Sequence, residues 1–99
     1  MIDDADLAGS YNWDEAEEQI ELLNSQNYKG FNDWRLPTKE ELDEIYLNRN
    51  EIGGFSAISY WSSTEYIAGL VWIQYFSSGY QNFNLKEYSL RQVRCVRSV

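Results

Sequence analysis

The stretch LVWIQYF at residues 70–76 decides how the chain must fold. Successive side chains of a strand point to opposite faces, and a strand with one solvated face alternates apolar with polar residues. Here both faces are apolar, with Leu70, Trp72 and Phe76 (and Gln74 among them) on one face and Val71, Ile73 and Tyr75 on the other. Such a strand is either buried on both sides or keeps one apolar face for a partner.

The length and charge of the chain limit the alternatives. Its 99 residues supply one hydrophobic core, so we expect a single domain over 1–99, which can also be the C-terminal module of a longer protein. The net charge of −8 argues against nucleic-acid binding, which needs clustered Lys and Arg, and against attraction to anionic membranes. Arg94 and Arg97 are available for a local basic pocket.

The segment MIDDADLAGS at 1–10 lacks the basic and apolar parts of a signal peptide, and no apolar run is long enough to cross a membrane. Membrane insertion is therefore not expected.

The residue types favour a non-catalytic protein. The chain has no histidine, which is the commonest general base and metal ligand. Cys95 is the only cysteine, and its setting in VRCVR indicates a buried thiol rather than a nucleophile. The carboxylates of 14–21 and 40–44 belong to the solvated faces of amphipathic helices. We expect no enzyme activity, no cofactor and no metal.

The pattern along the chain predicts helices first and strands afterwards. Asn12 with Glu15, and Thr38 with Glu41, have the spacing of capping boxes and mark two helix starts. From Ser59 onward the pattern indicates strands near 59–64, 70–76, 80–85 and 92–97, the second and third joined by Ser-Ser-Gly. This order predicts an α+β domain with an antiparallel sheet.

Three motifs resemble one known family. DWRLPTKEEL at 33–42, YWSSTEY at 60–66 and VRCVR at 93–97 are similar to the Lcl C-terminal-domain family, named after a collagen-like adhesin and also known as a major paralogous domain of bacterial surface proteins. The resemblance covers about residues 12–97. It implies a C-type-lectin-like fold, in which two helices pack on a twisted antiparallel β-sheet with a loop-rich ligand face. It also implies a binding module, not an enzyme, on a bacterial cell surface or a virion.

The resemblance assigns scaffold roles as well. It implies that Arg35 and Thr38 hold the DWRLPT turn against the sheet. It also implies a core that contains Trp34, Leu36, Trp61, Trp72 and Phe76.

Two departures from the family pattern stand out. Residues 1–11 are too polar for the extra N-terminal strand of many relatives, so that sheet edge is expected to be open, or covered by another chain or by a segment outside this sequence. Many relatives also carry a cysteine on the first helix to pair with the one in VRCVR. Here Ile20 or a neighbour occupies that region, so no disulfide is expected.

Residues 67–92 further resemble the variable region of diversity-generating retroelement proteins built on the same fold. Those elements mutate template adenines, which converts Asn codons into codons for Tyr, Ser, Ile, Leu, Val, Ala, Gly or Phe. Residues of this set lie here between Trp72, Gln74, Phe76, Gly79, Gln81 and Lys86. The ligand-binding candidates are Ile67, Ala68, Leu70, Ile73, Tyr75, Ser77, Ser78, Tyr80, Asn82, Phe83, Asn84, Leu85, Tyr88, Ser89 and Leu90.

In this interpretation the Trp72 face of the strand packs into the core and the Ile73 face is a recognition surface. The rigid anchors are Tyr75, Tyr80, Phe83 and Tyr88, and the adaptable polar contacts are Ser77, Ser78, Asn82 and Asn84. The partner is a protein or glycan on a target cell. Ordinary strands and turns can have the same composition, and then helices or an oligomer partner cover Val71, Ile73 and Tyr75. Two other functions stay open: a fixed-specificity glycan-binding adhesin, and a structural subunit that forms a homo-oligomer through this apolar face.

Overall fold

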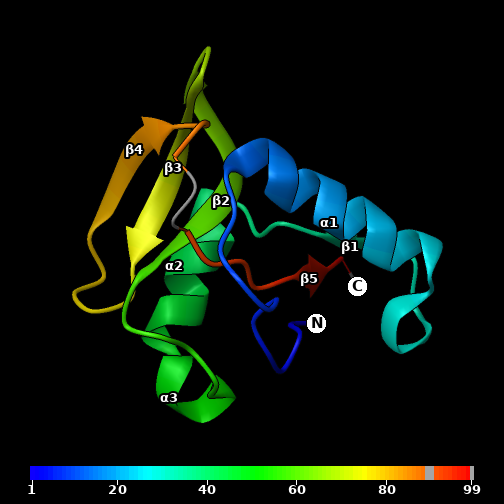
Figure 1. The fold of residues 1–99 in the computed structure, drawn as a ribbon. Coiled ribbons are helices and arrows are strands. Elements are labelled where there is room, and N and C mark those ends of the chain that lie inside the picture. The colour runs from blue at the N-terminus through cyan, green and yellow to red at the C-terminus, as the bar shows by residue number, and fades with distance from the viewer. Residues whose placement is uncertain (89–90, 99) are drawn as a thin grey trace.

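The computed structural model describes residues 1–88 and 91–98 and has helices and antiparallel strands, so the α+β class is confirmed (Figure 1). A two-stranded sheet has the order β1-β5, and a three-stranded sheet has the order β2-β3-β4. The helices are α1 Trp13–Ser25, the 3-10 turn η1 Tyr28–Gly30, α2 Lys39–Leu47 and α3 Arg49–Ile52. The strands are β1 Trp34–Arg35, β2 Ser59–Ile67, β3 Leu70–Tyr75, β4 Gln81–Leu85 and β5 Val96–Arg97.

Both predicted capping boxes are present. The amide of Glu15 donates to Asn12 Oδ1 at 2.8 Å, and the Glu15 carboxylate accepts the amide of Asn12 at 2.9 Å. At the start of α2 the amide of Glu41 donates to Thr38 Oγ1 at 3.2 Å, and the amide of Thr38 donates to Glu41 at 2.8 Å. Each box satisfies two amides that have no partner within the helix, which fixes where α1 and α2 begin.

The DWRLPT turn is held against the sheet by its backbone. The Pro37 carbonyl accepts the amide of Ser63 at 2.8 Å, and the amide of Lys39 donates to Thr64 Oγ1 at 2.9 Å. Arg35 instead forms a two-pronged ion pair with Glu41, at 2.7 and 2.8 Å. That pair, followed by the Thr38 amide, lowers the pKa of Glu41 to about 2. Arg35 also donates to Ser98 Oγ, just after β5, at 3.0 Å, so it joins the turn to the two-stranded sheet as expected. The expected role of Thr38 is corrected, because its side chain and amide bond to Glu41 and secure the start of α2.

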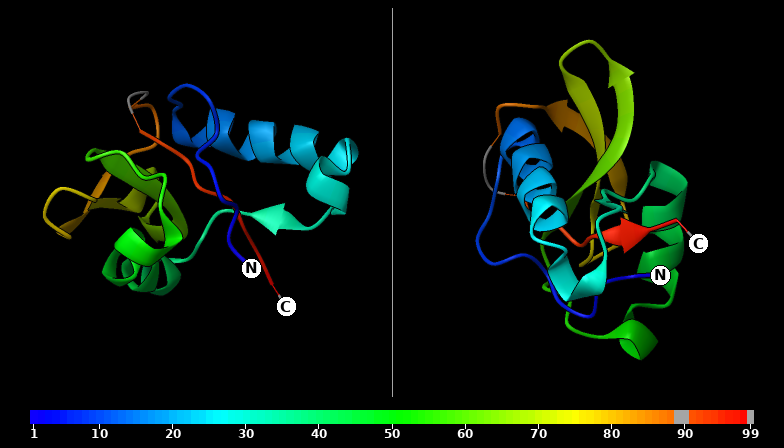
Figure 2. Two further views of the ribbon diagram at one scale, coloured as in Figure 1. Left: turned by 90° about the horizontal axis from the view of Figure 1, so that it is seen from below. Right: turned by 90° about the vertical axis from the view of Figure 1, so that its right-hand side faces the viewer.

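α1 and α2 lie on different sides of the C-terminal segment (Figure 2). α1 packs on the side of β3 that carries Val71 and Ile73, and α2 reaches Gln74 on the other side. One core cluster contains Ala16 and Ile20 of α1 together with Trp34, Leu36, Trp61, Val71, Ile73, Val93 and Cys95. A second cluster contains Leu42 and Ile45 of α2 together with Tyr60, Phe76 and Val96. Burial, the main cause, raises the pKa of the Cys95 thiol to about 12.

This packing corrects two predictions about β3. Ile73 is only 1% exposed and Val71 is fully buried, so both belong to the first core and not to a recognition surface; Tyr75, on the same face, is partly exposed. Trp72 was expected in the core and is only half-buried, whereas Trp34, Leu36, Trp61 and Phe76 are buried as predicted. Side chains alternate between the two faces of a strand, so Ile73 and Trp72 lie on opposite sides of β3. α1 covers the side with Val71 and Ile73, whereas α2 covers only part of the side with Trp72.

The N-terminal segment covers the edge that was expected to be open. Its amides at Asp3, Leu7 and Tyr11 donate to the carbonyls of Cys95, Val93 and Arg91 at 2.9 to 3.0 Å. Successive bonds are four residues apart in the N-terminal segment but two residues apart in residues 91–95. The segment therefore forms isolated bridges, such as Ile2 with Val96, and not a regular strand. This spacing explains why the segment shows no strand pattern in its sequence.

Arg94 joins three parts of the chain inside the protein. Its guanidinium is fully buried and contacts Asp6 at 2.8 Å, the Asp3 carbonyl at 3.0 Å and the Gly53 carbonyl at 3.2 Å. It also lies 3.9 Å from the centre of the Phe55 ring. Asp6 in turn accepts the hydroxyl of Tyr60 at 2.6 Å. Burial, and then this hydrogen bond, raises the pKa of Tyr60 to about 12.

We predict that Arg94→Met lowers the free energy of unfolding by about 3–5 kcal/mol, because the carboxylate of Asp6 would stay in the interior without its partner. Urea unfolding monitored by tryptophan fluorescence measures the loss. The control is Arg97→Met, since the Arg97–Asp33 pair at 2.5 Å lies at the surface and solvent screens it. Similar small losses in both variants would contradict the role given to Arg94.

Candidate functional site

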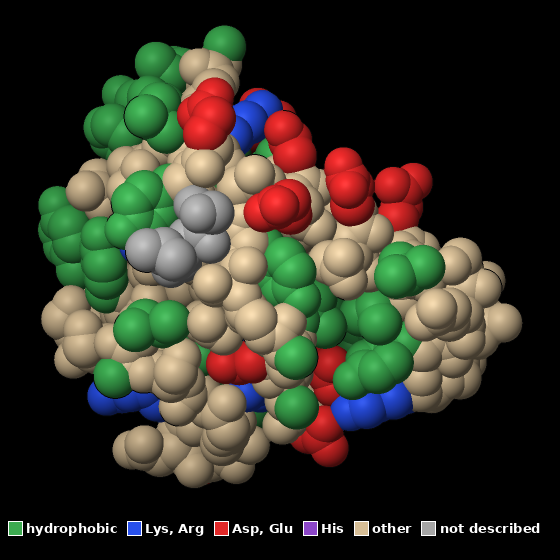
Figure 3. Space-filling model, in the orientation of Figure 1, with side chains coloured by type: hydrophobic (Ala, Val, Ile, Leu, Met, Phe, Trp, Pro, Cys, Tyr) green, Lys and Arg blue, Asp and Glu red, His purple; other side chains and the backbone are tan. Residues whose placement is uncertain are grey.

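The exposed part of residues 66–88 forms one continuous region, which we call the hairpin surface. It covers the β2–β3 turn, the β3–β4 connection and β4, and hydrophobic side chains gather there, whereas acidic side chains line α1 (Figure 3). Its exposed apolar residues are Tyr66, Ile67, Tyr80, Phe83, Leu85 and Tyr88. So many exposed apolar groups in one region indicate an interaction surface.

Three rings form an aromatic cluster on the side of the hairpin that faces away from α1. Phe83 stacks on Tyr66 with ring centres 4.3 Å apart, and Trp72 meets both rings edge to face at 5.6 and 5.7 Å. The ammonium of Lys39, at the start of α2, lies 4.2 Å from the Trp72 ring centre. Each ring supports the next, so the cluster presents apolar area with little loss of side-chain freedom on binding.

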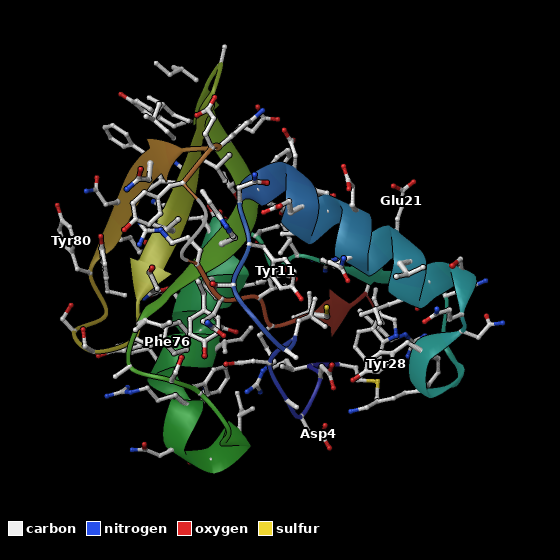
Figure 4. The ribbon with its side chains drawn as sticks, in the orientation of Figure 1. Asp4, Tyr11, Glu21, Tyr28, Phe76 and Tyr80 are labelled. Atoms are coloured by element: carbon white, nitrogen blue, oxygen red, sulfur yellow. The ribbon has the colours of Figure 1, made fainter. Side chains whose placement is uncertain are left out.

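A second group of rings, the tyrosine cluster, lies on the other side of the hairpin. Tyr75 and Tyr80 stack at 6.3 Å, and the guanidinium of Arg91 lies 4.2 Å from the Tyr88 ring centre and 5.7 Å from that of Tyr75. Arg91 is buried and donates to Ser59 Oγ at 2.6 Å, so it is a support for these rings. Tyr80 is 60% exposed and points away from the sheet, whereas Phe76 lies inside near α2 (Figure 4).

The residues between the exposed ones hold the hairpin in place. Gln74 is fully buried and donates to Asp43 at 2.9 Å and to the Gly79 carbonyl at 3.0 Å. Gln81 donates to the Lys39 carbonyl at 2.9 Å, and Lys86 pairs with Glu65 at 3.0 Å while covering the Trp13 ring. These side chains link the hairpin to α2 and to the start of α1.

The structure brings most of the predicted ligand residues to the hairpin surface. Eight of them are exposed, namely Ile67, Ala68, Ser77, Ser78, Tyr80, Phe83, Leu85 and Tyr88, and four have intermediate exposure, namely Leu70, Tyr75, Asn82 and Asn84. Ile73 is excluded by its burial, and Ser89 and Leu90 lie outside the described residues.

The predicted residues do not form one face, however. The register places Phe83 opposite Trp72 and Asn82 opposite Ile73, so Phe83 and Asn82 point to different sides of the hairpin. The prediction also missed Tyr66 and Lys39, which contact the aromatic cluster from β2 and α2. No local pattern could have found them, because their contacts depend on strand register and helix position.

Arg94 and Arg97 are not free to form a local basic pocket, because each is paired with a carboxylate. Arg94 is buried against Asp6, and Arg97 is paired with Asp33. A groove of about 430 Å³ lies between α2, α3, β5 and the first residues of the chain, away from the hairpin surface. Within residues 1–88 and 91–98, no three His, Cys, Asp or Glu side chains are placed to hold a metal ion. The hairpin surface therefore offers rings, amides and hydroxyls, which provide contact area and hydrogen bonds to a ligand.

Comparison with known proteins defines the class. The Lcl C-terminal domain matches over residues 3–97, so the chain belongs to this family. Membership indicates an adhesin-like or surface-associated module. A comparison with curated proteins finds no match. None of the helices in the described part of the chain combines the length and apolar character needed to cross a bilayer.

A comparison of Gly79 with Gly69 separates the effect of packing against Tyr46 from the effect of a left-handed backbone. Gly79 and Gly69 have nearly the same left-handed φ, +80° and +82°. A Cβ on Gly79 would lie 2.5 Å from the Tyr46 ring, whereas a Cβ on Gly69 would meet nothing within 4 Å. We predict that Gly79→Ala lowers the free energy of unfolding by about 1–3 kcal/mol more than Gly69→Ala, because only Gly79→Ala displaces a packed ring.

Chemical denaturation of the two single variants measures this difference. Equal losses would show that strain alone determines both values and that the β3–β4 connection is not packed against α2.

Proposed function

We propose that this chain is a non-catalytic ligand-binding module with a C-type-lectin-like fold, displayed on a bacterial surface or a virion. The hairpin surface is its ligand face, and its exposed residues are interchangeable between related copies of the protein. The partner is a protein or glycan on the surface of a target cell. Family membership supports the surface location.

One observation carries this proposal. Along residues 67–88, side chains that are buried or packed against the scaffold are interspersed with side chains that are exposed to solvent. Gln74, Phe76 and Gly79 are fixed by burial or close packing, while the serines at 77 and 78 and Tyr80 beside them are exposed. A scaffold whose exposed side chains make few internal contacts tolerates their exchange, because the core residues are elsewhere. Among the predicted ligand residues that the structure describes, Ile73 alone is buried, and it is not part of the proposed ligand face.

The ring chemistry of the exposed residues also supports binding. Tyrosine and phenylalanine supply large contact areas with few rotatable bonds, and serine and asparagine supply adaptable hydrogen bonds. The side chains of β4 carry no charge, although the chain as a whole carries −8. An uncharged surface on an acidic protein can approach anionic cell surfaces with less repulsion than α1 can.

We predict that Tyr80→Ala combined with Phe83→Ala reduces binding to target cells at least about tenfold, because buried aromatic anchors carry most of the energy of an interface. Labelled protein is mixed with a panel of bacterial strains, and cell-bound fluorescence is measured by flow cytometry. The control is Leu22→Ala with Leu47→Ala, which removes exposed apolar groups from α1 and α2. Equal binding by both double variants, on cells that bind the unchanged protein, would contradict the assignment of the ligand face.

A fixed-specificity glycan adhesin is the second candidate, and the aromatic cluster favours it. Tyr66 and Trp72 lie outside the interchangeable set, and their rings together with Phe83 form an apolar platform of the kind that packs against sugar rings. DNA sequence around the gene separates the two candidates. A near-copy of the segment for residues 67–92, differing at adenines and next to a reverse-transcriptase gene, indicates diversification. Without such a copy, specific binding on a glycan array supports the adhesin.

A further inference from the structure

β4 is the open edge of the three-stranded sheet in the described part of the chain. The other outer strand, β2, is covered: the amide of Trp61 donates to the Gln92 carbonyl at 3.1 Å, and the amide of Gln92 donates to the Ser59 carbonyl at 2.9 Å. An uncovered edge presents unpaired amides and carbonyls, which can pair with a strand of another chain.

The pairing of β4 with β3 determines which amides point outward. The amide of Tyr75 donates to the Tyr80 carbonyl and the amide of Lys86 donates to the Gly69 carbonyl. Hydrogen-bonded pairs alternate with non-hydrogen-bonded pairs in an antiparallel ladder. The pairs Gln74–Gln81, Trp72–Phe83 and Leu70–Leu85 are therefore non-hydrogen-bonded, and the amides of Gln81, Phe83 and Leu85 point away from β3.

Asparagine side chains occupy two of these three outward amides, those of Phe83 and Leu85. The amide of Phe83 donates to Asn82 Oδ1 at 2.9 Å, and the amide of Leu85 donates to Asn84 Oδ1 at 2.8 Å. The two side-chain oxygens thus bind the donors that the carbonyls of an added strand would bind. An incoming strand gains no new partner for these amides until both asparagines move away.

The edge is otherwise suited to a second copy of this chain. All side chains of β4 are uncharged, whereas the acidic surface of α1 makes two copies repel elsewhere (Figure 3). Antiparallel pairing of two β4 strands is self-complementary, as a two-fold interface requires. It would also bring Phe83 and Leu85 of each copy onto one face, beside their aromatic clusters.

We infer that the β4 edge is able to pair with a second copy of this chain and that Asn82 and Asn84 prevent this pairing in the unchanged protein. Both asparagines belong to the set predicted to be interchangeable. Their replacement by residues without a side-chain acceptor therefore changes assembly as well as ligand contacts.

The test uses a double variant that carries both Asn82→Val and Asn84→Val. Sedimentation equilibrium between about 5 and 300 μM compares its mass with that of the unchanged protein. Valine suits a strand and removes both acceptors. We expect the unchanged protein to keep its monomer mass of 11.7 kDa. The double variant is expected to double its mass as the concentration rises. A monomeric double variant, or a dimer of the unchanged protein, would overturn the inference.

Two controls identify the interface. Adding Leu85→Pro to the double variant removes one outward amide without touching the β3 ladder, and proline is tolerated at such edge positions; the expected result is a monomer. Ser77→Val with Ser78→Val adds the same apolar groups off the edge and is also expected to stay monomeric. A dimer in either control would overturn the inference, because the interface would then not be the β4 edge.

If the valine variant precipitates, a double variant with Asn82→Ala and Asn84→Ala takes its place, because it removes the same acceptors and adds less apolar area. Amide hydrogen exchange then gives the readout: protection at Phe83 and Leu85 should increase at least tenfold with concentration. No increase would overturn the inference.

Discussion

Arg94 is fully buried, and its positive charge has one carboxylate partner, Asp6. A buried ion costs several kcal/mol unless it is paired and its remaining donors are bonded, so the surrounding chain must supply those partners. The N-terminal segment supplies Asp6 and the Asp3 carbonyl, and the end of α3 supplies the Gly53 carbonyl. This requirement draws the N-terminal segment and the end of α3 onto the chain around Arg94. Gln92, two residues earlier, pairs with β2, so β4 is the open edge of the three-stranded sheet in the described part of the chain.

The hairpin surface lies outside this network. Its supports are local: Gln74 and Gln81 bond to α2, and Arg91 lies beneath the tyrosine cluster. Because the core is complete without the side chains of Tyr80, Leu85 or the serines between the strands, these residues are available for contacts with a partner. The fold thereby separates residues that hold the structure from residues that present a surface.

Local patterns predicted much of this fold, and long-range contacts determined the rest. Capping boxes at Asn12 and Thr38 gave both helix starts because their partners lie three residues away. The buried face of β3 was not predictable, since both faces are apolar and only the position of α1 decides between them. The bonds of residues 1–11 to the C-terminal segment and the Arg94–Asp6 pair join residues 80 or more positions apart, so no local sequence pattern could predict them. The site was predicted as a segment, but strand register divided it between two sides.

The central claim is that exposed residues of 67–88 can be exchanged without loss of folding. The most direct measurement is a library of all single substitutions in this segment, scored by resistance to protease as a measure of folding. We predict broad tolerance at Ser77, Tyr80 and Leu85, and loss of resistance for most changes at Ile73 and Gln74. Equal sensitivity at exposed and buried positions would contradict the account, because the surface would then be part of the scaffold.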